Sequence, residues 1–121
     1  MTTQEVAQKL VDLCKAGKAM EAIHSLYGAD IVSVEATPMP DGSREMKGLA
    51  AVTGKSEWWY GAHEIHSATV EGPLVSGDRF CVRFAYDITN KPTGKRMTMD
   101  ELAIYEVKDG KIVREEFFYA T

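Results

Sequence analysis

Strand-like segments fill the second half of the chain, and this run limits the possible fold more than any other feature of the sequence. Each segment is rich in β-branched and aromatic residues, and steps that contain Gly, Pro or Asp separate it from the next. Turns this short predict antiparallel neighbours within one sheet. The strands are expected at residues 63–70, 79–89, 96–107 and 111–119.

The first half of the chain favours helices. Thr2 and Glu5 have the spacing of a capping box, apolar residues follow at helical spacing, and Gly17 is a typical helix end. Further helices are expected at residues 18–27 and 48–62, with a strand at 30–36 and a surface loop at 37–46 between them. Helices followed by a run of antiparallel strands predict an α+β fold, with the helices on one face of a curved sheet.

Length, charge and cysteine content exclude several classes of protein. A chain of 121 residues is expected to form one domain over residues 1–121. The net charge of −4 and the lack of a basic cluster make nucleic acid and anionic membranes poor partners. The N-terminus is amphipathic and contains acids, unlike a signal peptide or a membrane span. Cys14 and Cys81 lack metal or redox spacing, so we expect both to be reduced and buried in a cytoplasmic protein.

Adjacent acids on the last two predicted strands are the main candidates for chemistry. The final strand contains Glu115 and Glu116, and the strand before it contains Asp100 and Glu101. Successive side chains of a strand point to opposite faces, so each pair sends one carboxyl group to each face. One acid from each pair is therefore expected on the same face of the sheet.

The glycine turn between these strands decides which acids meet. A three-residue loop would pair Val107 with Lys111. Glu101 and Glu115 would then be diagonal neighbours, about 7–8 Å apart. A two-residue loop would instead make Glu101 diagonal to Glu116. Either register predicts a carboxylate pair on one side of the sheet.

Four segments follow one another along the chain: LYGADIVSVEA after the helical hairpin, SEWWYGAHEIHS, GDRFCVRFAYDIT and the closing hairpin EVKDGKIVREEFFY. In this order they resemble the SnoaL-like domain of the nuclear-transport-factor-2-like superfamily, which includes ketosteroid isomerases, over essentially the whole chain. The resemblance implies a cone-shaped α+β barrel, in which a strongly bent, mostly antiparallel sheet wraps around the N-terminal helices. It also implies an internal apolar pocket for a small apolar molecule and a homodimer through the outer face of the sheet.

Both faces of the last two strands carry apolar residues, so periodicity alone does not identify the inward face. The resemblance favours the face that holds Glu101 and Glu115, and it places Glu35 near the pocket mouth. The outward residues would then be Leu102, Ile104, Ile112 and Phe118. On the strand at 79–89, the inward residues would be Phe80, Val82, Phe84, Tyr86 and Ile88. The residues expected to line the pocket are Tyr27, Trp58, Phe84, Tyr86, Met99, Tyr105, Phe117 and Tyr119.

Two carboxyl groups in an apolar pocket repel each other and lose hydration, and both effects raise a pKa. Glu101, Glu115 and Glu35 are thus candidate acid–base residues for isomerisation, cyclisation or dehydration of a small apolar carbonyl compound. The alternative is a non-catalytic ligand-binding or dimerisation module with structural acids. In that case the glutamates would pair with Arg83, Arg96 or Arg114, or they would lie at a dimer interface.

Other chemistries have less support in the sequence. The positions of the ketosteroid isomerase catalytic residues align with Leu10, Ala36 and Ala103, so that mechanism is not implied. His63 and His66 would oppose each other on a strand, so no metal site is expected, although one of them could reach the pocket rim as a base. No glycine-rich phosphate loop or nucleophile elbow is present, and no cofactor is expected.

Overall fold

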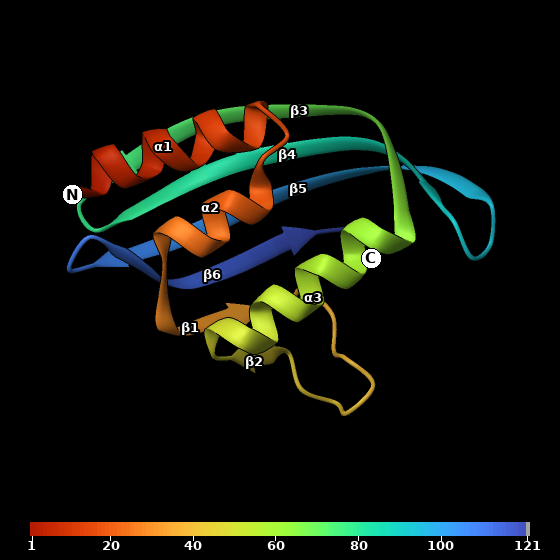
Figure 1. Ribbon diagram of the computed structural model, residues 1–121, viewed down its shortest axis with the longest axis horizontal. Coiled ribbons are helices and arrows are strands. Elements are labelled where there is room, and N and C mark those ends of the chain that lie inside the picture. Colours follow the sequence, from red (N-terminus) through yellow and green to blue (C-terminus); the bar gives the residue numbers. More distant parts are fainter. Residues whose placement is uncertain (121) are drawn as a thin grey trace.

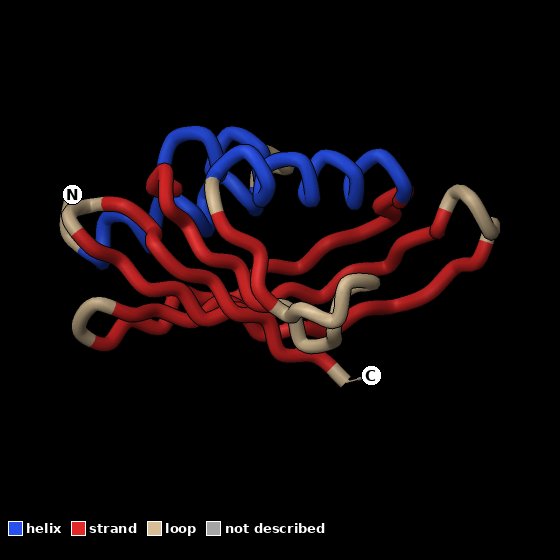
Figure 2. The backbone as a smooth tube through the Cα atoms, turned by 90° about the horizontal axis from the view of Figure 1, so that it is seen from below, coloured by secondary structure: helices blue, strands red, loops and turns tan. Residues whose placement is uncertain are grey.

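The structure is a computed structural model that describes residues 1–120. Its elements are α1 (Thr3–Lys15), α2 (Ala19–Leu26), β1 (Tyr27–Val34), β2 (Glu45–Lys47), α3 (Leu49–Ala62), β3 (His63–Ser76), β4 (Arg79–Asn90), β5 (Lys95–Lys108) and β6 (Lys111–Tyr119). The three helices lie over one face of the sheet, with α1 along β3 and β4 (Figure 1 and Figure 2). The predicted α+β fold is confirmed.

The strands form one sheet in the order β2-β1-β6-β5-β4-β3. Strand β1 joins the sheet out of chain order and runs parallel to β6, with Ser33 opposite Glu115. The other neighbouring strands are antiparallel, as predicted for residues 63–119. The sheet stays open, because β2 and β3 form its two edges. The pairing of β1 with β6 places inward side chains from both ends of the chain beside each other.

The predicted capping box begins α1. The Thr2 hydroxyl accepts a hydrogen bond from the Glu5 backbone N–H at 3.1 Å, and the Glu5 carboxylate accepts one from the Thr2 N–H at 3.0 Å. Val6 and Leu10 follow on the buried side of the helix. Gly17 has a φ of 73°, which glycine adopts readily, and it allows the chain to turn into α2.

The inner face of β4 and β5 forms much of the core, and it is the face that the family resemblance favoured. Phe80, Val82, Phe84 and Ile88 are buried on β4, together with Ala103 and Tyr105 on β5. On the outer face of β5 and β6, the exposed large apolar side chains are Leu102, Ile104 and Phe118. The predicted choice of inward face is therefore confirmed for these residues.

The closing hairpin has the two-residue loop that was one of the two predicted alternatives, but not the register expected from it. Lys108 pairs with Lys111, so the loop holds two residues. A bulge then leaves Val113 without a partner in the ladder. Beyond the bulge, Glu115 and Phe117 lie opposite Tyr105 and Ala103, so they share a face with these residues, as predicted. The prediction that Ile112 faces outward is wrong, because it lies before the bulge and pairs with Val107 in the core.

Two segments contain more strand than expected. The predicted surface loop includes the short strand β2, which pairs with the end of β1. Strand β3 continues to Ser76, because a register shift between Glu71 and Leu74 lets the ladder resume beyond the Gly-Pro step. Among residues 1–120, none of the helices has the length and apolar character needed to cross a bilayer.

Candidate functional site

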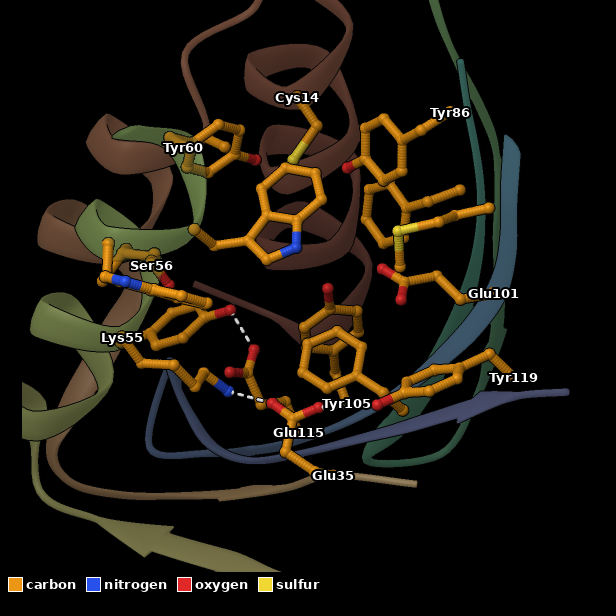
Figure 3. A pocket seen from close by; sticks show the side chains of 18 of the residues that line it. Cys14, Glu35, Lys55, Ser56, Tyr60, Tyr86, Glu101, Tyr105, Glu115 and Tyr119 are labelled. Atoms are coloured by element: carbon orange, nitrogen blue, oxygen red, sulfur yellow. Dashed lines mark hydrogen bonds and ion pairs between the residues drawn. The ribbon is translucent and has the colours of Figure 1, made fainter. Parts of the chain in front are cut away.

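A cavity of about 440 Å³ lies between the helices and the inner face of the sheet (Figure 3). A volume of this size is typical of small-molecule sites. Its wall includes every predicted catalytic residue: Glu35, Glu101 and Glu115. It also includes the residues predicted as pocket-lining: Tyr27, Trp58, Phe84, Tyr86, Met99, Tyr105, Phe117 and Tyr119. The chemical roles of these residues stay predictions.

Glu115 lies at the base of the cavity and is only 3% exposed. Its carboxyl group accepts hydrogen bonds from the Tyr27 hydroxyl and, at 2.9 Å, from the Ser33 hydroxyl. Burial raises the pKa of Glu115, and the hydrogen bonds from Tyr27 and Ser33 partly oppose this rise. Burial, together with the adjacent Glu115, also raises the pKa of Tyr27. Both oxygens of Glu115 are therefore held in place by the protein itself.

Lys55 on α3 connects this buried acid to Glu35. Its ammonium group donates to the Ser33 hydroxyl at 2.8 Å and to the Glu35 carboxylate at 2.5 Å. The Tyr119 hydroxyl lies 3.4 Å from the second oxygen of Glu35. Lys55 also lies over the ring of Phe117, 5.3 Å from its centre. This network joins α3, β1 and β6 along one side of the cavity.

Glu101 differs from Glu115, because its carboxyl group has no hydrogen-bonding partner among residues 1–120. It enters from β5 on the wall opposite Lys55 (Figure 3). Burial raises its pKa to about 7, with smaller contributions from the charges of Glu35 and Glu115, while Lys55 opposes the rise. Near neutral pH, Glu101 is therefore present both as an acid and as a base.

The two glutamates are not diagonal neighbours, which corrects the predicted spacing. Glu101 lies opposite Tyr119, whereas Glu115 lies opposite Tyr105, further along the ladder. The two-residue loop and the bulge at Val113 together cause this difference, because each moves the later residues of β6 by one position relative to β5. Glu101 and Glu115 still share the inner face, and each charge affects the cavity, but they do not form a close pair.

Aromatic side chains also line the cavity that Glu101 faces. The hydroxyl groups of Tyr60 and Tyr86 point into the same space (Figure 3). Burial raises the pKa of Tyr60 to about 12 and raises that of Tyr86 as well, so both hydroxyl groups stay protonated near neutral pH. Trp59 packs against Tyr86 with ring centres 5.5 Å apart, while Trp58 stands at the rim with 66% of its side chain exposed.

The arginines do not neutralise the inward acids. The three arginines that were expected as possible partners bind outward acids instead: Arg83 binds Asp100 at 2.6 Å, Arg96 binds Asp87 at 2.8 Å, and Arg114 binds Glu116 at 3.3 Å. The alternative in which arginines bind Glu101 or Glu115 is therefore wrong. It fails because successive residues of β5 and β6 face opposite sides of the sheet.

His63 and His66 lie outside the cavity wall, which corrects the prediction that one of them reaches the rim of the pocket. His63 is hydrogen-bonded to the Trp59 carbonyl at 2.8 Å, and His66 to the Thr89 hydroxyl at 2.6 Å. Over residues 1–120, no three His, Cys, Asp or Glu side chains gather as metal ligands would.

A model of the SnoaL-like domain matches residues 1–119. The chain belongs to this family. A Mesorhizobium loti protein, provisionally named a SnoaL-like polyketide cyclase and also labelled a carbohydrate phosphatase, is 44% identical, with a TM-score of 0.92 over 98% of this chain and 100% of its own. No curated protein matches the chain.

Two more distant structures share the fold of this SnoaL-like domain. A Bacillus subtilis protein provisionally named an isomerase has a TM-score of 0.81 and 19% identity, over 99% of this chain and 90% of its own. A nuclear-transport-factor-2-like protein of unknown function from Mesorhizobium loti has a TM-score of 0.69 and 20% identity, over 98% and 91%. At these identities, the similarity concerns the fold alone.

Sequence reasoning missed several polar residues of the SnoaL-like domain's cavity. Lys55 lies at helical spacing from the buried Val52, which places it on the inward side of α3. Ser33 lies between Ile31 and Glu35 on the inward side of β1, where alternation could have identified it. Cys14 also lines the cavity. Cys14 and Cys81 are both free, as expected, but the prediction that both are buried is wrong, because each is only partly buried.

Proposed function

We propose that this SnoaL-like domain is an acid–base enzyme that works without a cofactor on a small, largely apolar carbonyl compound, as isomerases, cyclases and dehydratases do. The observation that supports this proposal is the carboxyl group of Glu101. It faces the cavity, has no hydrogen-bonding partner among residues 1–120, and has a pKa raised to about 7. A group with this pKa can both accept and return a proton near neutral pH.

In the proposed reaction, the ionised Glu101 removes a proton from the carbon next to the substrate carbonyl. The electron pair of the broken C–H bond moves towards the carbonyl oxygen and forms an enol or enolate. Glu101 then returns the proton to another carbon. Alternatively, the enolate carbon attacks a second carbonyl carbon of the same substrate, and the oxygen of that carbonyl takes up the proton from Glu101. Tyr86, Tyr105 and Tyr119 would orient the substrate, and the apolar wall keeps the carboxyl group poorly hydrated.

Glu115 and Glu35 would have supporting roles in this mechanism. Glu115 already accepts two hydrogen bonds from Tyr27 and Ser33, and Glu35 is paired with Lys55. A carboxylate with such partners is a weaker base than one without them. Glu101 is therefore the residue that we assign to proton transfer.

Hydrogen exchange at carbon tests the assignment of Glu101. Small apolar ketones such as acetophenone are incubated with the protein in heavy water, and the loss of the α-hydrogen signal is followed by nuclear magnetic resonance. We expect the wild type to accelerate exchange and Glu101→Gln to lose at least about a hundredfold of this rate. Asp100→Asn is the matched control, because Asp100 is adjacent in sequence but points outward to Arg83.

A non-catalytic ligand-binding module is the second candidate function. The observation that favours it is that Tyr27 and Ser33 already bind Glu115, so that among residues 1–120 only the Glu101 carboxyl group faces the cavity without a partner. Ketone binding without any acceleration of exchange would favour the module and exclude the enzyme. Equal exchange rates in the wild type and Glu101→Gln would also contradict the role proposed for Glu101.

We also propose that two copies of the chain form a homodimer through the outer face of the sheet. The exposed apolar side chains of Leu102, Ile104 and Phe118 support this proposal, because apolar groups gathered on one face favour association. The proposed dimer interface does not include the cavity, since the cavity lies on the other side of the sheet.

A further inference from the structure

Lys55 has hydrogen-bonding capacity that the protein does not use. A lysine ammonium group carries three N–H donors. Among residues 1–120, two acceptors bind them: the Ser33 hydroxyl at 2.8 Å and the Glu35 carboxylate at 2.5 Å. Lys55 lines the cavity, and only 19% of its side chain is exposed. One donor is thus left at the cavity wall, largely shielded from solvent.

The two protein partners hold this donor in a fixed position. Ser33 passes its own hydrogen to Glu115, so its oxygen is free to accept from Lys55. Glu35 belongs to the segment directly after β1, and the ring of Phe117 lies beneath the ammonium group. A lysine side chain is flexible by itself, but contacts from β1 and β6 restrict this one. A donor that is held in one position can bind one defined atom of a ligand.

The surrounding charges select the kind of acceptor that the donor can bind. Glu35 neutralises the charge of Lys55, so this part of the cavity offers a hydrogen bond with little net positive charge. Glu101 and Glu115 add negative character elsewhere on the wall. These acids would therefore repel a carboxylate or phosphate ligand more strongly than Lys55, which is already paired with Glu35, would attract it. A neutral carbonyl oxygen meets no such repulsion.

We propose that Lys55 binds the carbonyl oxygen of the substrate and that the substrate is a neutral ketone or aldehyde, which lies between Lys55 and Glu101. This inference rests on the proposed function and adds to it the binding group and the charge of the substrate. The two side chains enter from opposite walls, α3 and β5, as this arrangement requires (Figure 3).

The position of Lys55 fits the charge that the proposed reaction creates. When Glu101 removes a proton, negative charge develops on the carbonyl oxygen. The Lys55 donor is already in place, so its bond to this oxygen strengthens without rearrangement of the protein. Hydrogen bonds to charged groups stabilise more than hydrogen bonds between neutral groups. Lys55 would thus stabilise the enolate more than the ketone.

The vibration of a bound ketone tests this inference without any turnover. The carbonyl stretching band of acetophenone, isotope-labelled at the carbonyl carbon, is measured by infrared difference spectroscopy on the whole protein. We expect the band in the wild type to shift to lower frequency relative to acetophenone in an apolar solvent. In Lys55→Met, we expect this shift to disappear and the affinity to fall on the order of tenfold.

Three further variants make the test specific. Lys9→Met is the matched control, because Lys9 is exposed on α1 and should leave the band unchanged. The double variant Lys55→Met with Glu35→Gln removes both charges together, and it replaces the single variant if an unpaired Glu35 prevents folding. Glu35→Gln alone leaves Lys55 without its counter-charge, so we expect an even larger downward shift.

The outcomes separate this inference from the proposed function. An equal band position in the wild type and both Lys55 variants would overturn the role of Lys55, even if Glu101 catalyses exchange. Tighter binding of benzoate than of acetophenone would overturn the preference for a neutral carbonyl. If acetophenone binds and shows the Lys55 shift but Glu101→Gln keeps its exchange rate, the proposed function fails and the carbonyl site remains.

Discussion

Glu101 and Glu115 share one face of the sheet but differ in what satisfies their carboxyl groups. Tyr27 and Ser33 donate to Glu115, whereas Glu101 faces the cavity without such donors among residues 1–120. The raised pKa of Glu101 links the proposed chemistry to stability. Between its ordinary pKa of 4.5 and about 7, the folded protein holds a proton that the unfolded chain releases. Stability therefore decreases as pH rises through this interval.

Glu101→Gln should remove this dependence, because a neutral amide has no proton to lose. At about pH 8 we expect the variant to be more stable than the wild type, by up to about 3 kcal/mol, and near pH 4 we expect the difference to vanish. Urea unfolding across this pH range measures the effect. Glu116→Gln serves as the control, because that acid points outward to Arg114. A constant difference at every pH would contradict a raised pKa at Glu101.

Lys55 shows why some site residues escape sequence reasoning. Its partners Ser33 and Glu35 lie on a different element, and only the packing of α3 against β1 brings them together. Acid–base candidates on neighbouring strands were easier to find, because strand alternation fixes the face of each side chain. Helical spacing could place Lys55 on the inward side of α3, but it could not identify the two acceptors.

At the scale of elements, the sequence predicted the existence and order of helices and strands better than their register. Capping residues and alternation act locally, so the start of α1 and the sharing of one face by Glu101 and Glu115 follow from short segments, whereas the inward face itself was chosen from the family resemblance. The bulge at Val113 does not, because it depends on how β6 fits both β5 and β1. That bulge decides which residue lies opposite Glu101, and therefore the geometry of the cavity.

The start of α3 provides a test at the scale of elements, because this helix carries Lys55. Gly48 precedes the helix with a φ of 95°, a conformation that other residues adopt only with strain. Gly48→Ala should lower the free energy of unfolding by about 1–3 kcal/mol. Gly54→Ala, within the same helix and with open space around it, should instead raise it by about 0.5–1 kcal/mol. Urea unfolding of both variants would contradict this account if the signs were equal.

At the scale of the whole molecule, the outer face of the sheet determines the proposed assembly. Leu102, Ile104 and Phe118 are exposed there, at 45%, 40% and 44%. We expect the wild type to have the mass of two chains in light scattering, and Phe118→Asp to shift it towards one. Trp58→Glu is the control, because Trp58 is exposed on α3 on the helical side of the sheet. A wild type with the mass of one chain would exclude the dimer.

The parallel pairing of β1 with β6 has a consequence for synthesis on the ribosome. Ser33 and Glu115, which meet through a hydrogen bond, are separated by 82 residues. While the chain is still emerging, β1 has no permanent neighbour on that side, and contacts so distant in sequence form slowly. The nascent protein must therefore carry an unfinished cavity until its final strand leaves the exit tunnel.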